Sequence, residues 1–397
     1  MNYPKSRIPT LPVLSLASFV HNDRRHIPSI LDADVAKFVT SGRVAIALAL
    51  QQMKIGKNDK VLLPAYHCSS MVEPVIWAGA VPIFYKIRPD TSVDLDDVEA
   101  LLDSSIKLLL ITHYFGFPQD LPKIRHFCDE HNILLLEDCA HSFFGEHSGR
   151  PLGSFGDYAI ASAMKFFPIY EGGCLVSFRH HLTPLNLTSA GAGFEVKAAL
   201  NTLEKGFDYG RLPVLQKLIQ VPLRLKNFIW SFVKRRIPEE RSTLGPGASD
   251  GGFGFETKWL GKQSSFVSRY LIKRISKNRI AEKRRKNYMT LLAGLTGIPG
   301  CRPLFPDLPE GVFPYVFPLI TDEPERKFPA LKNAGVPVIR FGEFLWEGME
   351  ATICPTSVDL SRRVLQFPCH QELSAAEMTW MISEARNVLL SDESPGK

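Results

Sequence analysis

The sequence has no long hydrophobic run, and this absence limits the classes of protein it can belong to. No stretch of its 397 residues approaches the roughly 20 consecutive apolar residues that a membrane-spanning helix needs. The first 20 residues carry Lys5 and Arg7, but they contain three prolines and no unbroken apolar core. We therefore expect no signal peptide and a cytoplasmic protein.

Paired cysteines and nucleotide-binding glycine motifs are also missing. The seven cysteines form no C-x-x-C pair and no zinc spacing, so we expect reduced thiols and no metal site. No G-x-G-x-x-G follows the first predicted strand and no G-x-x-x-x-G-K-[ST] occurs, so the sequence supports neither dinucleotide nor P-loop chemistry. A net charge of +6 is modest, and without a recognition motif we expect no nucleic-acid partner.

What is present is an ordinary globular composition, with 45% hydrophobic and 22% charged residues, and room for two domains. Short apolar runs alternate with helical patterns, which indicates a mainly parallel sheet covered by helices on both faces. The predicted strands are 61–65, 81–87, 107–114, 133–138, 158–163 and 173–178, and the predicted helices between them are 70–78, 95–102 and 122–131.

The stretch 162–173 combines features that suit an aldehyde cofactor carrying a phosphate. Lys165 follows an apolar strand, three residues after Ser162, and Glu171-Gly172-Gly173 comes shortly after it. A lysine beside apolar surface loses hydration, which favours the free amine that forms a Schiff base. The serine hydroxyl and nearby backbone amides can hold a phosphate. For this stretch alone, a strand that ends in a snorkelling lysine is the alternative.

Two further segments fit such a cofactor. Asp138 ends a buried-looking strand, where α/β sheets place their ligands, and an aspartate paired with a protonated pyridine nitrogen keeps pyridoxal phosphate (PLP) an electron sink. Ser41-Gly42-Arg43 opens a helix whose free amides and dipole attract a phosphate. An ordinary capped core helix is the alternative reading of this second segment.

Four motifs in this order resemble the sugar-nucleotide aminotransferases of the DegT/StrS type, a branch of the fold-type I PLP enzymes. They are Asp138-x-x-His141, Gly153-Ser154-Phe155-Gly156-Asp157, Ser162-x-x-Lys165 and Glu171-Gly172-Gly173. The resemblance runs from about Ser41 to Val388 and is interrupted by one segment. It implies an α/β fold with an N-terminal arm (1–34), a large PLP-binding domain (35–258, with an insertion at about 195–255), and a linking helix with a small α+β domain (259–397).

The resemblance also implies roles for single residues. Lys165 would hold PLP and then move a proton between cofactor and substrate carbons, while Asp138 would keep the pyridine nitrogen protonated. His141 would lie near the 3-oxygen of the cofactor. Ser41, Ser162 and the backbone of Gly42 and Arg43 would bind the phosphate, with Arg43 replacing the usual threonine of the family.

One family position departs from the pattern in the loop after the first strand. Cys68 stands where the family usually has an aromatic residue that stacks on the cofactor. Tyr66 or His67 must then take this role. We favour His67, whose imidazole can stack and also approach the reacting carbon; a plain loop histidine is the alternative. His113-Tyr114-Phe115-Gly116 also matches a family segment, and we expect a structural role for it.

The implied amino donor is glutamate, and the implied acceptor is a keto-sugar nucleotide used for polysaccharides or glycoconjugates. The implied assembly is a homodimer with composite sites. Three alternatives stay open: a relative that acts on a non-sugar keto substrate, a sugar dehydratase, and a binding or regulatory protein that keeps the fold without turnover. Lys165 argues against the dehydratase, because that branch carries histidine in its place.

Two segments of the chain are rich in basic residues, and one further arginine, Arg340, is a candidate ligand contact. Segment 211–241 holds eight basic and two acidic residues, a net charge equal to the +6 of the whole chain, and 223–237 is a predicted amphipathic helix. Such a helix suits weak peripheral contact with an anionic membrane; packing on a dimer partner or over the active site is the alternative. Segment 259–288 is predicted to be one long linking helix with a solvated basic face. Arg340 is either an anion contact or a surface arginine.

Overall fold

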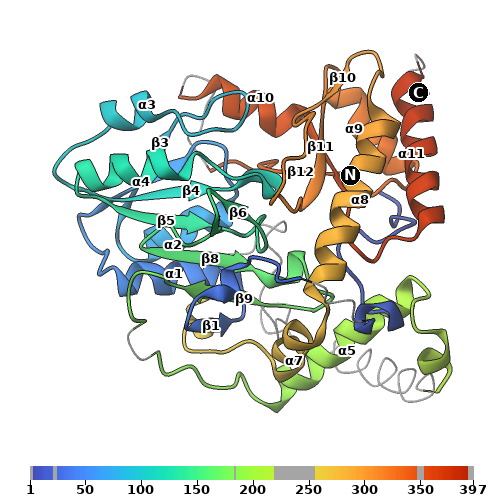
Figure 1. Cartoon of the computed structure of the whole chain (residues 1–397), viewed down its shortest axis with the longest axis horizontal. Helices are drawn as coiled ribbons and strands as arrows, with labels where there is room; N and C mark the ends of the chain where they lie inside the picture. The colour runs from blue at the N-terminus through green and yellow to red at the C-terminus, as the bar shows by residue number, and fades with distance from the viewer. Residues whose placement is uncertain (1–2, 21–24, 183–184, 219–254, 347–352, 392–397) are drawn as a thin grey trace, which may run out of the picture.

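A seven-stranded sheet forms the larger part of the molecule, on the left in Figure 1. The structure is a computed structural model, and it describes residues 3–20, 25–182, 185–218, 255–346 and 353–391. The strand order is β1-β9-β8-β5-β4-β2-β3. The bounds are β1 Ala36–Val39, β2 Lys60–Pro64, β3 Val81–Tyr85, β4 Ile106–Thr112, β5 Leu134–Asp138, β8 Tyr158–Ser162 and β9 Gly173–Val176.

Most of this sheet is parallel, as the sequence predicts. The pairs β8–β5, β5–β4, β4–β2 and β2–β3 are parallel. Strand β9 runs antiparallel to β8 and to β1, so the edge next to the chain start is antiparallel. The expected α/β fold with a mainly parallel central sheet is therefore confirmed.

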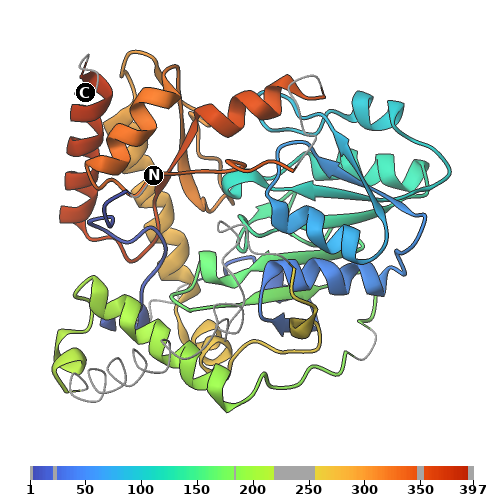
Figure 2. The same ribbon diagram turned by 180° about the vertical axis from the view of Figure 1, so that it is seen from behind.

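Helices cover both faces of the large sheet, and this explains its continuous apolar strands. Leu108, Leu109 and Leu110 in β4 are all fully buried, with Leu108 and Leu110 in one hydrophobic cluster and Leu109 in the other. The first cluster includes α1 (Gly42–Gln52) and α2 (Ser69–Trp77), which lie over the sheet in blue in Figure 2. On the opposite face lie α3 (Leu95–Ala100) and α4 (Leu121–Glu130), as Figure 1 shows.

A second, four-stranded sheet forms a smaller α+β lobe, on the right in Figure 1. Its strands pair antiparallel in the order β10-β11-β13-β12. The expected α+β character of this part is confirmed, whereas the residue at which one domain ends and the next begins stays a prediction. The bounds are β10 Cys301–Pro303, β11 Val316–Thr321, β12 Ile339–Arg340, β13 Val364–Pro368, α9 Pro324–Asn333, α10 Pro355–Arg363 and α11 Ala375–Leu390.

The prediction of one long linking helix over 259–288 is wrong. The segment contains α7 (Phe266–Arg274) and α8 (Lys277–Leu295), with a break between them. Ser276 caps the second helix, because its side-chain oxygen accepts a hydrogen bond of 3.2 Å from the backbone N–H of Arg279. The basic residues are not all solvated either: Arg284 is fully buried and Arg279 pairs with Glu372.

The N-terminal arm lies against other parts of the molecule, as expected. The backbone N–H of Arg7 donates to the carbonyl of Gly335, and Nε2 of His370 donates to the carbonyl of Pro9. Ser15 donates to Glu372 at 2.6 Å. Shorter elements complete the described chain: η1 Leu16–Phe19, η2 Ile30–Asp32, η3 Tyr114–Gly116, β6 Glu146–His147, β7 Arg150–Pro151, η4 Ala163–Lys165 and η6 Thr257–Trp259.

Part of the predicted insertion is described, and part is not. Helix α5 (Ala192–Asp208) packs against α7. The predicted amphipathic helix 223–237 lies outside the described residues. Among the described residues, no helix combines the length and the apolar character needed to cross a membrane.

Candidate active site

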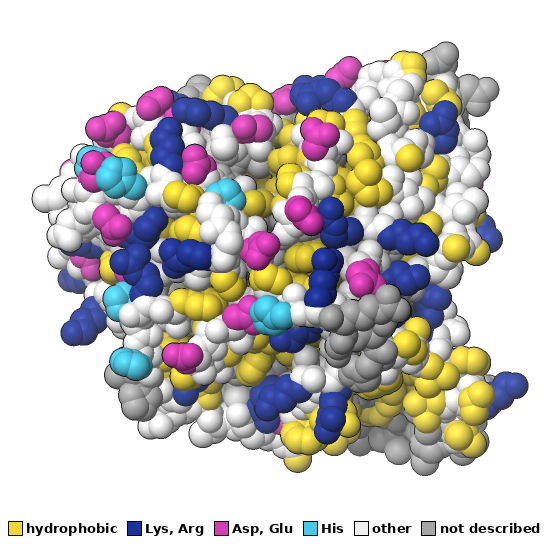
Figure 3. Space-filling view, in the orientation of Figure 1, with side chains coloured by type: hydrophobic (Ala, Val, Ile, Leu, Met, Phe, Trp, Pro, Cys, Tyr) yellow, Lys and Arg dark blue, Asp and Glu magenta, His cyan; other side chains and the backbone are white. Residues whose placement is uncertain are grey.

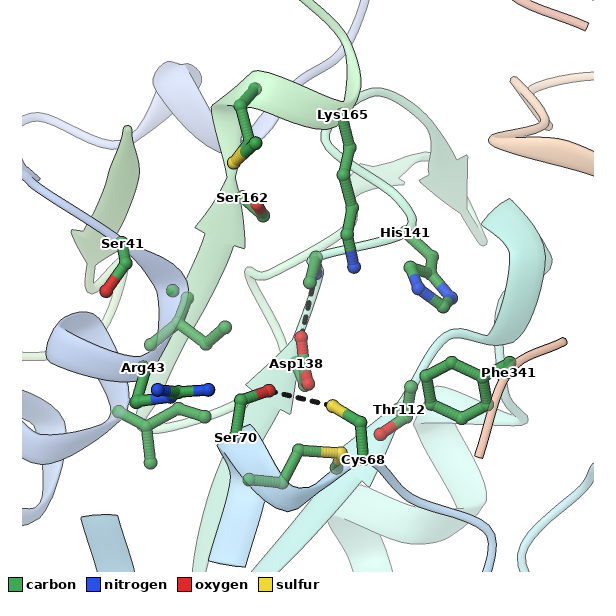
Figure 4. Close-up of a pocket in the computed structure, with 16 residues that line it drawn as sticks. Ser41, Arg43, Cys68, Ser70, Thr112, Asp138, His141, Ser162, Lys165 and Phe341 are labelled. Atoms are coloured by element: carbon green, nitrogen blue, oxygen red, sulfur yellow. Dashed lines mark hydrogen bonds between the residues drawn. The ribbon is translucent and has the colours of Figure 1, made fainter. Parts of the chain in front are cut away.

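A pocket opens where the parallel strands of the large sheet end, and most of the predicted site residues line it (Figure 4). Asp138 comes from the end of β5, Ser162 and Lys165 from β8 and the turn after it, and His141 from the loop after β5. The start of α1 supplies Ser41, Gly42 and Arg43. Segments far apart in the sequence are thus brought together at one edge of the sheet, as the rule for α/β folds requires.

Asp138 is a buried acid aimed into the same space as Lys165 (Figure 4). Its Oδ1 accepts a hydrogen bond of 2.8 Å from the backbone N–H of Ala140. Burial raises the pKa of Asp138, an effect that this hydrogen bond, Lys165 and His113 partly oppose. A cation placed beside this carboxyl group would therefore be stabilised.

His141 is a neutral hydrogen-bond donor. Burial, assisted by the charge of Lys165, lowers its pKa well below the usual value. Its Nδ1 accepts a hydrogen bond of 3.3 Å from the backbone N–H of Phe115, so the single proton of the neutral ring is on Nε2. The ring stacks on Tyr315 with centroids 4.7 Å apart. This stacking fixes the direction in which Nε2–H can donate.

The start of α1 and Ser162 form one end of the pocket, and its chemistry suits an anion. Ser41 caps the helix by accepting from the backbone N–H of Val44 at 3.3 Å. A Cβ on Gly42 would reach only ordinary contact, 3.8–3.9 Å from Ile160, Ala161 and Ser162. The free amides at this helix start suit a phosphate.

Gly173 explains why β9 can lie against this end. A Cβ built on Gly173 would lie 2.2 Å from the carbonyl carbon and oxygen of Ser41, which no side chain tolerates. The glycine of the Glu171-Gly172-Gly173 motif therefore allows the backbone of β9 to touch the cap of α1. Glu171 itself is buried and accepts hydrogen bonds from Ser264 and Ser265, a structural role.

Arg43 brings a side-chain cation to the pocket, in addition to the backbone role predicted for it. Its side chain is nine-tenths buried, and its Nε lies 3.1 Å from Oε2 of Glu73. Burial raises the pKa of Glu73, and the charge of Arg43 opposes this shift. The threonine that the family carries at this position is thus replaced by a buried ion pair.

The prediction that His67 or Tyr66 stacks on a cofactor is corrected by the structure, because neither side chain lines the pocket. Tyr66 is fully buried and stacks on Tyr114. His67 stacks on Phe84 with centroids 4.7 Å apart. Its Nδ1–H donates to the Pro64 and Ala65 carbonyls.

The other imidazole nitrogen of His67 is also engaged in the protein interior. Nε2 accepts from the backbone N–H of Trp346 at 3.0 Å. Burial lowers the pKa of His67 to about 4, which keeps this acceptor available at neutral pH. Cys68 lines the pocket in place of the two rings.

The pocket also contains residues that the sequence reasoning missed. Thr112 ends β4 directly beside Asp138 in the sheet, so its strand-end position was a usable signal. Phe341 comes from the small lobe, and nothing in the sequence around it indicates a place in the pocket. An adjoining pocket shares Lys165 and His141 and adds Tyr315 and Arg340. Arg340 pairs with Glu343 at 3.2 Å and is largely buried, so it is a lining residue rather than a free surface arginine.

His113 and Glu137 are structural, as expected for the histidine. Nε2 of His113 donates to Glu137, whose oxygens also accept from the backbone N–H groups of Gly153, Phe155 and Gly156. Together with Cys139 these side chains have the spacing of a metal site. The oxygens of Glu137 already hold the Gly153–Gly156 turn, which explains that motif without a metal.

The comparison with solved structures defines the class of fold: the chain has the fold of the fold-type I transferases. A putative sugar aminotransferase from Streptococcus pneumoniae, Spr1654 in its PLP form, superposes with a TM-score of 0.65 at 16% identity, over 98% of this chain and 99% of that one. DesV of S. venezuelae, solved with a ketimine intermediate, superposes with a TM-score of 0.61 at 20% identity, over 91% of this chain and 86% of that one.

Within that class, residues 25–201 match the model of the DegT/DnrJ/EryC1/StrS aminotransferase family. The match covers less than half of the chain, and it confirms the resemblance of the motifs to this family.

Relatives with assigned reactions match over a similar part. GDP-perosamine synthase of Vibrio cholerae is 29% identical over 168 residues, 42% of this chain and 46% of that protein. L-glutamine:2-deoxy-scyllo-inosose aminotransferase of Streptomyces kanamyceticus is 33% identical over 141 residues, 35% and 33% of the two chains. The chain thus spans less than half the length of these relatives.

Proposed function

We propose that the protein is a PLP-dependent aminotransferase that transfers an amino group, with glutamate as the donor, to a keto-sugar nucleotide. The observation that carries this proposal is the meeting of Lys165, Asp138, neutral His141 and the start of α1 in one pocket. The part of the chain that holds these residues matches the model of an aminotransferase family, which supports the proposal.

The residues present fit the cofactor. Asp138 is a buried carboxyl group that gains from a neighbouring cation, which suits a protonated pyridine nitrogen. Nε2–H of His141 can donate to an oxygen on the ring. The amides of Gly42 and Arg43 with the hydroxyls of Ser41 and Ser162 suit the phosphate. The ring position expected for Tyr66 or His67 is taken by the smaller Cys68.

When bound, PLP supplies an electron sink for the carbanion formed at the substrate carbon. The protein supplies the rest. The ε-amine of Lys165 would hold the cofactor and, once freed by the amino donor, would act as general base and acid, moving a proton between the substrate carbon and the cofactor carbon. Asp138 would keep the ring nitrogen protonated through its charge. Tyr315 and Phe341 cover the pocket from the small lobe and reduce the access of water.

We also propose a homodimer, as the resemblance of the motifs implies, and a cytoplasmic location, as the sequence predicts. Weak peripheral contact with a membrane is a further proposal that depends on residues 211–241, most of which lie outside the described part of the chain.

A second candidate is an aminotransferase for a keto substrate that carries no nucleotide, with glutamine as donor. It is favoured by the similarity to the 2-deoxy-scyllo-inosose enzyme. A binding protein without turnover is less well supported, because the pocket keeps both Lys165 and Asp138.

The test is a half-reaction on the purified yellow protein. Glutamate and glutamine are added separately, and the absorbance of the bound aldehyde cofactor is followed as it converts to the amine form. Keto-sugar nucleotides and keto-cyclitols are then screened for the reverse conversion. No conversion with any amino donor would contradict the proposed activity.

A further inference from the structure

Arg284 carries a positive charge into the interior, beside the pocket but not in its lining. It lies on α8, which runs from α7 along the small lobe (Figure 1) and packs against β10, β11 and α11. Its side chain is fully buried. The guanidinium lies over the ring of Phe166, with Cζ 4.4 Å from the ring centroid.

All of its described hydrogen bonds go to the segments that frame the pocket. Nη2 donates to the backbone carbonyl of Lys165 at 2.7 Å. Nη1 donates to the carbonyls of Tyr315 at 2.9 Å and Pro314 at 3.2 Å. Nε donates to Oε1 of Gln371 at 3.2 Å, and Gln371 in turn donates to the carbonyl of Phe166 at 2.7 Å. One planar group thus joins the turn after β8, the start of β11 and the loop after β13.

Stability alone does not explain a buried guanidinium at this position. Burying a guanidinium without a carboxylate partner is unfavourable, and an apolar side chain of similar size often serves stability as well or better. In the described part of the chain, Arg284 forms no ion pair, and burial lowers its pKa to about 10. What the guanidinium adds is direction, because its donors are fixed in one plane.

The held segments carry the side chains that face the proposed cofactor. The carbonyl carbon of Lys165 is bonded to the Cα that carries the lysine side chain. The orientation of this carbonyl therefore sets the direction in which the side chain leaves the backbone. Tyr315 stacks on His141, and the Lys165 Nζ lies 5.4 Å from the centroid of the Tyr315 ring. Arg284 therefore links the backbone at Tyr315, directly before β11, to the backbone of Lys165.

We propose that Arg284 is a positioning residue that holds the backbone of Lys165 and of Tyr315 in the geometry required for the reaction. This inference rests on the proposed function, since it takes Lys165 as the reactive amine. Arg284 does not touch the substrate; it acts through the two segments that it joins.

The neighbouring residue provides a matched control. Arg285 also donates to backbone carbonyls, those of Pro309 and Val312 in the loop before Pro314, but it has no hydrogen bond to the Lys165 turn among the described contacts. Arg284→Lys and Arg284→Gln are compared with Arg285→Lys in the full-length protein loaded with PLP. The readouts are the rate of borohydride trapping at Lys165, the visible circular dichroism of the bound cofactor, and kcat and KM in the half-reaction.

Both Arg284 variants are expected to lower kcat by about 10-fold to 100-fold, because small misplacements of a reacting group have effects of this size. The visible dichroism should change and the KM for the amino donor should change little. Arg285→Lys should stay within about twofold of the wild type. Folded Arg284 variants with the kcat and dichroism of Arg285→Lys would overturn the inference.

A second variant covers the case in which Arg284 variants do not fold. Gln371→Met removes the link from Nε of Arg284 to Phe166 and leaves the charge in place. We expect kcat to fall by about 3-fold to 10-fold with the same change in dichroism, and an unchanged kcat would overturn the inference. A wild-type protein that forms no adduct at Lys165 would instead overturn the proposed function, and this inference with it.

Discussion

At the scale of single residues, Lys165 and Asp138 reach the pocket from neighbouring strand ends and have separable roles. Lys165→Ala should leave the fold nearly intact, because the side chain is partly exposed, but no cofactor should be trapped by borohydride. Asp138→Ala should retain some PLP while transamination falls by at least about 100-fold. Mass spectrometry of the reduced proteins and the half-reaction rate measure both effects. A cofactor adduct on the Lys165→Ala protein would show that the lysine assignment is wrong.

Asp138 also gives a pH-dependent stability in the cofactor-free protein. Its folded pKa is raised by burial, so its contribution to stability is fully present below the unfolded pKa and is lost as the pH rises through the folded pKa. Asp138→Asn removes this loss. We expect the melting temperature of the variant to gain on that of the wild type between pH 4 and pH 7, as followed by calorimetry on both apoproteins. A constant difference across this range would argue against a raised pKa.

At the scale of elements, strand β9 completes the anion-binding end because Gly173 lies against Ser41. Gly173→Ala should destabilise the protein by about 1–3 kcal/mol through overpacking, and it should weaken cofactor binding. Gly193→Ala in α5 is the control, since a Cβ there meets nothing within 4 Å and alanine favours the helix. Denaturant unfolding and fluorescence titration with PLP measure the two effects. Equal PLP affinity in both variants would contradict this role of β9.

The strands could be predicted because both faces of the large sheet are buried. The predicted run 107–114 overlaps β4, whose leucines pack alternately into the two hydrophobic clusters. The break between α7 and α8 was missed because it depends on a single serine cap within a basic pattern. The antiparallel placement of β9 was missed because an apolar run predicts a buried strand but does not show in which direction the strand runs in the sheet.

The pocket could be predicted where function depends on strand ends and helix starts, as for Asp138, Lys165 and Gly42. His67 was placed wrongly because the orientation of its ring is set by Phe84 and Trp346, residues far along the chain. Arg284 was interpreted as part of a solvated face because its partners are backbone carbonyls, which leave no trace in a sequence.

At the scale of the whole molecule, exposed apolar side chains gather over α5 and α7, at the lower edge of the face in Figure 3. Val196, Phe266 and Tyr270 are 57%, 67% and 46% exposed. Such a patch is typical of a protein contact. We expect the two subunits of the proposed homodimer to meet on this face.

The dimer can be tested on this patch. Phe266→Glu should shift the protein from dimer to monomer in sedimentation velocity and reduce activity on dilution by about 10-fold or more. Met289→Glu, an exposed position on α8, is the control and should leave the dimer intact. A wild-type monomer that is fully active at low concentration would contradict the dimer with composite sites.

The contact between Gly173 and Ser41 also bears on how the protein is made in the cell. β9 is the last strand of the large sheet in the chain, yet it inserts between β1 and β8, which are synthesised earlier. A nascent chain therefore lacks the proposed phosphate end of the pocket until β9 has left the ribosome and docked, and until then the proposed cofactor PLP could not stabilise it. Because a ligand that binds only the folded state adds stability by mass action, the supply of vitamin B6 should help to decide how much of the finished chain escapes proteolysis.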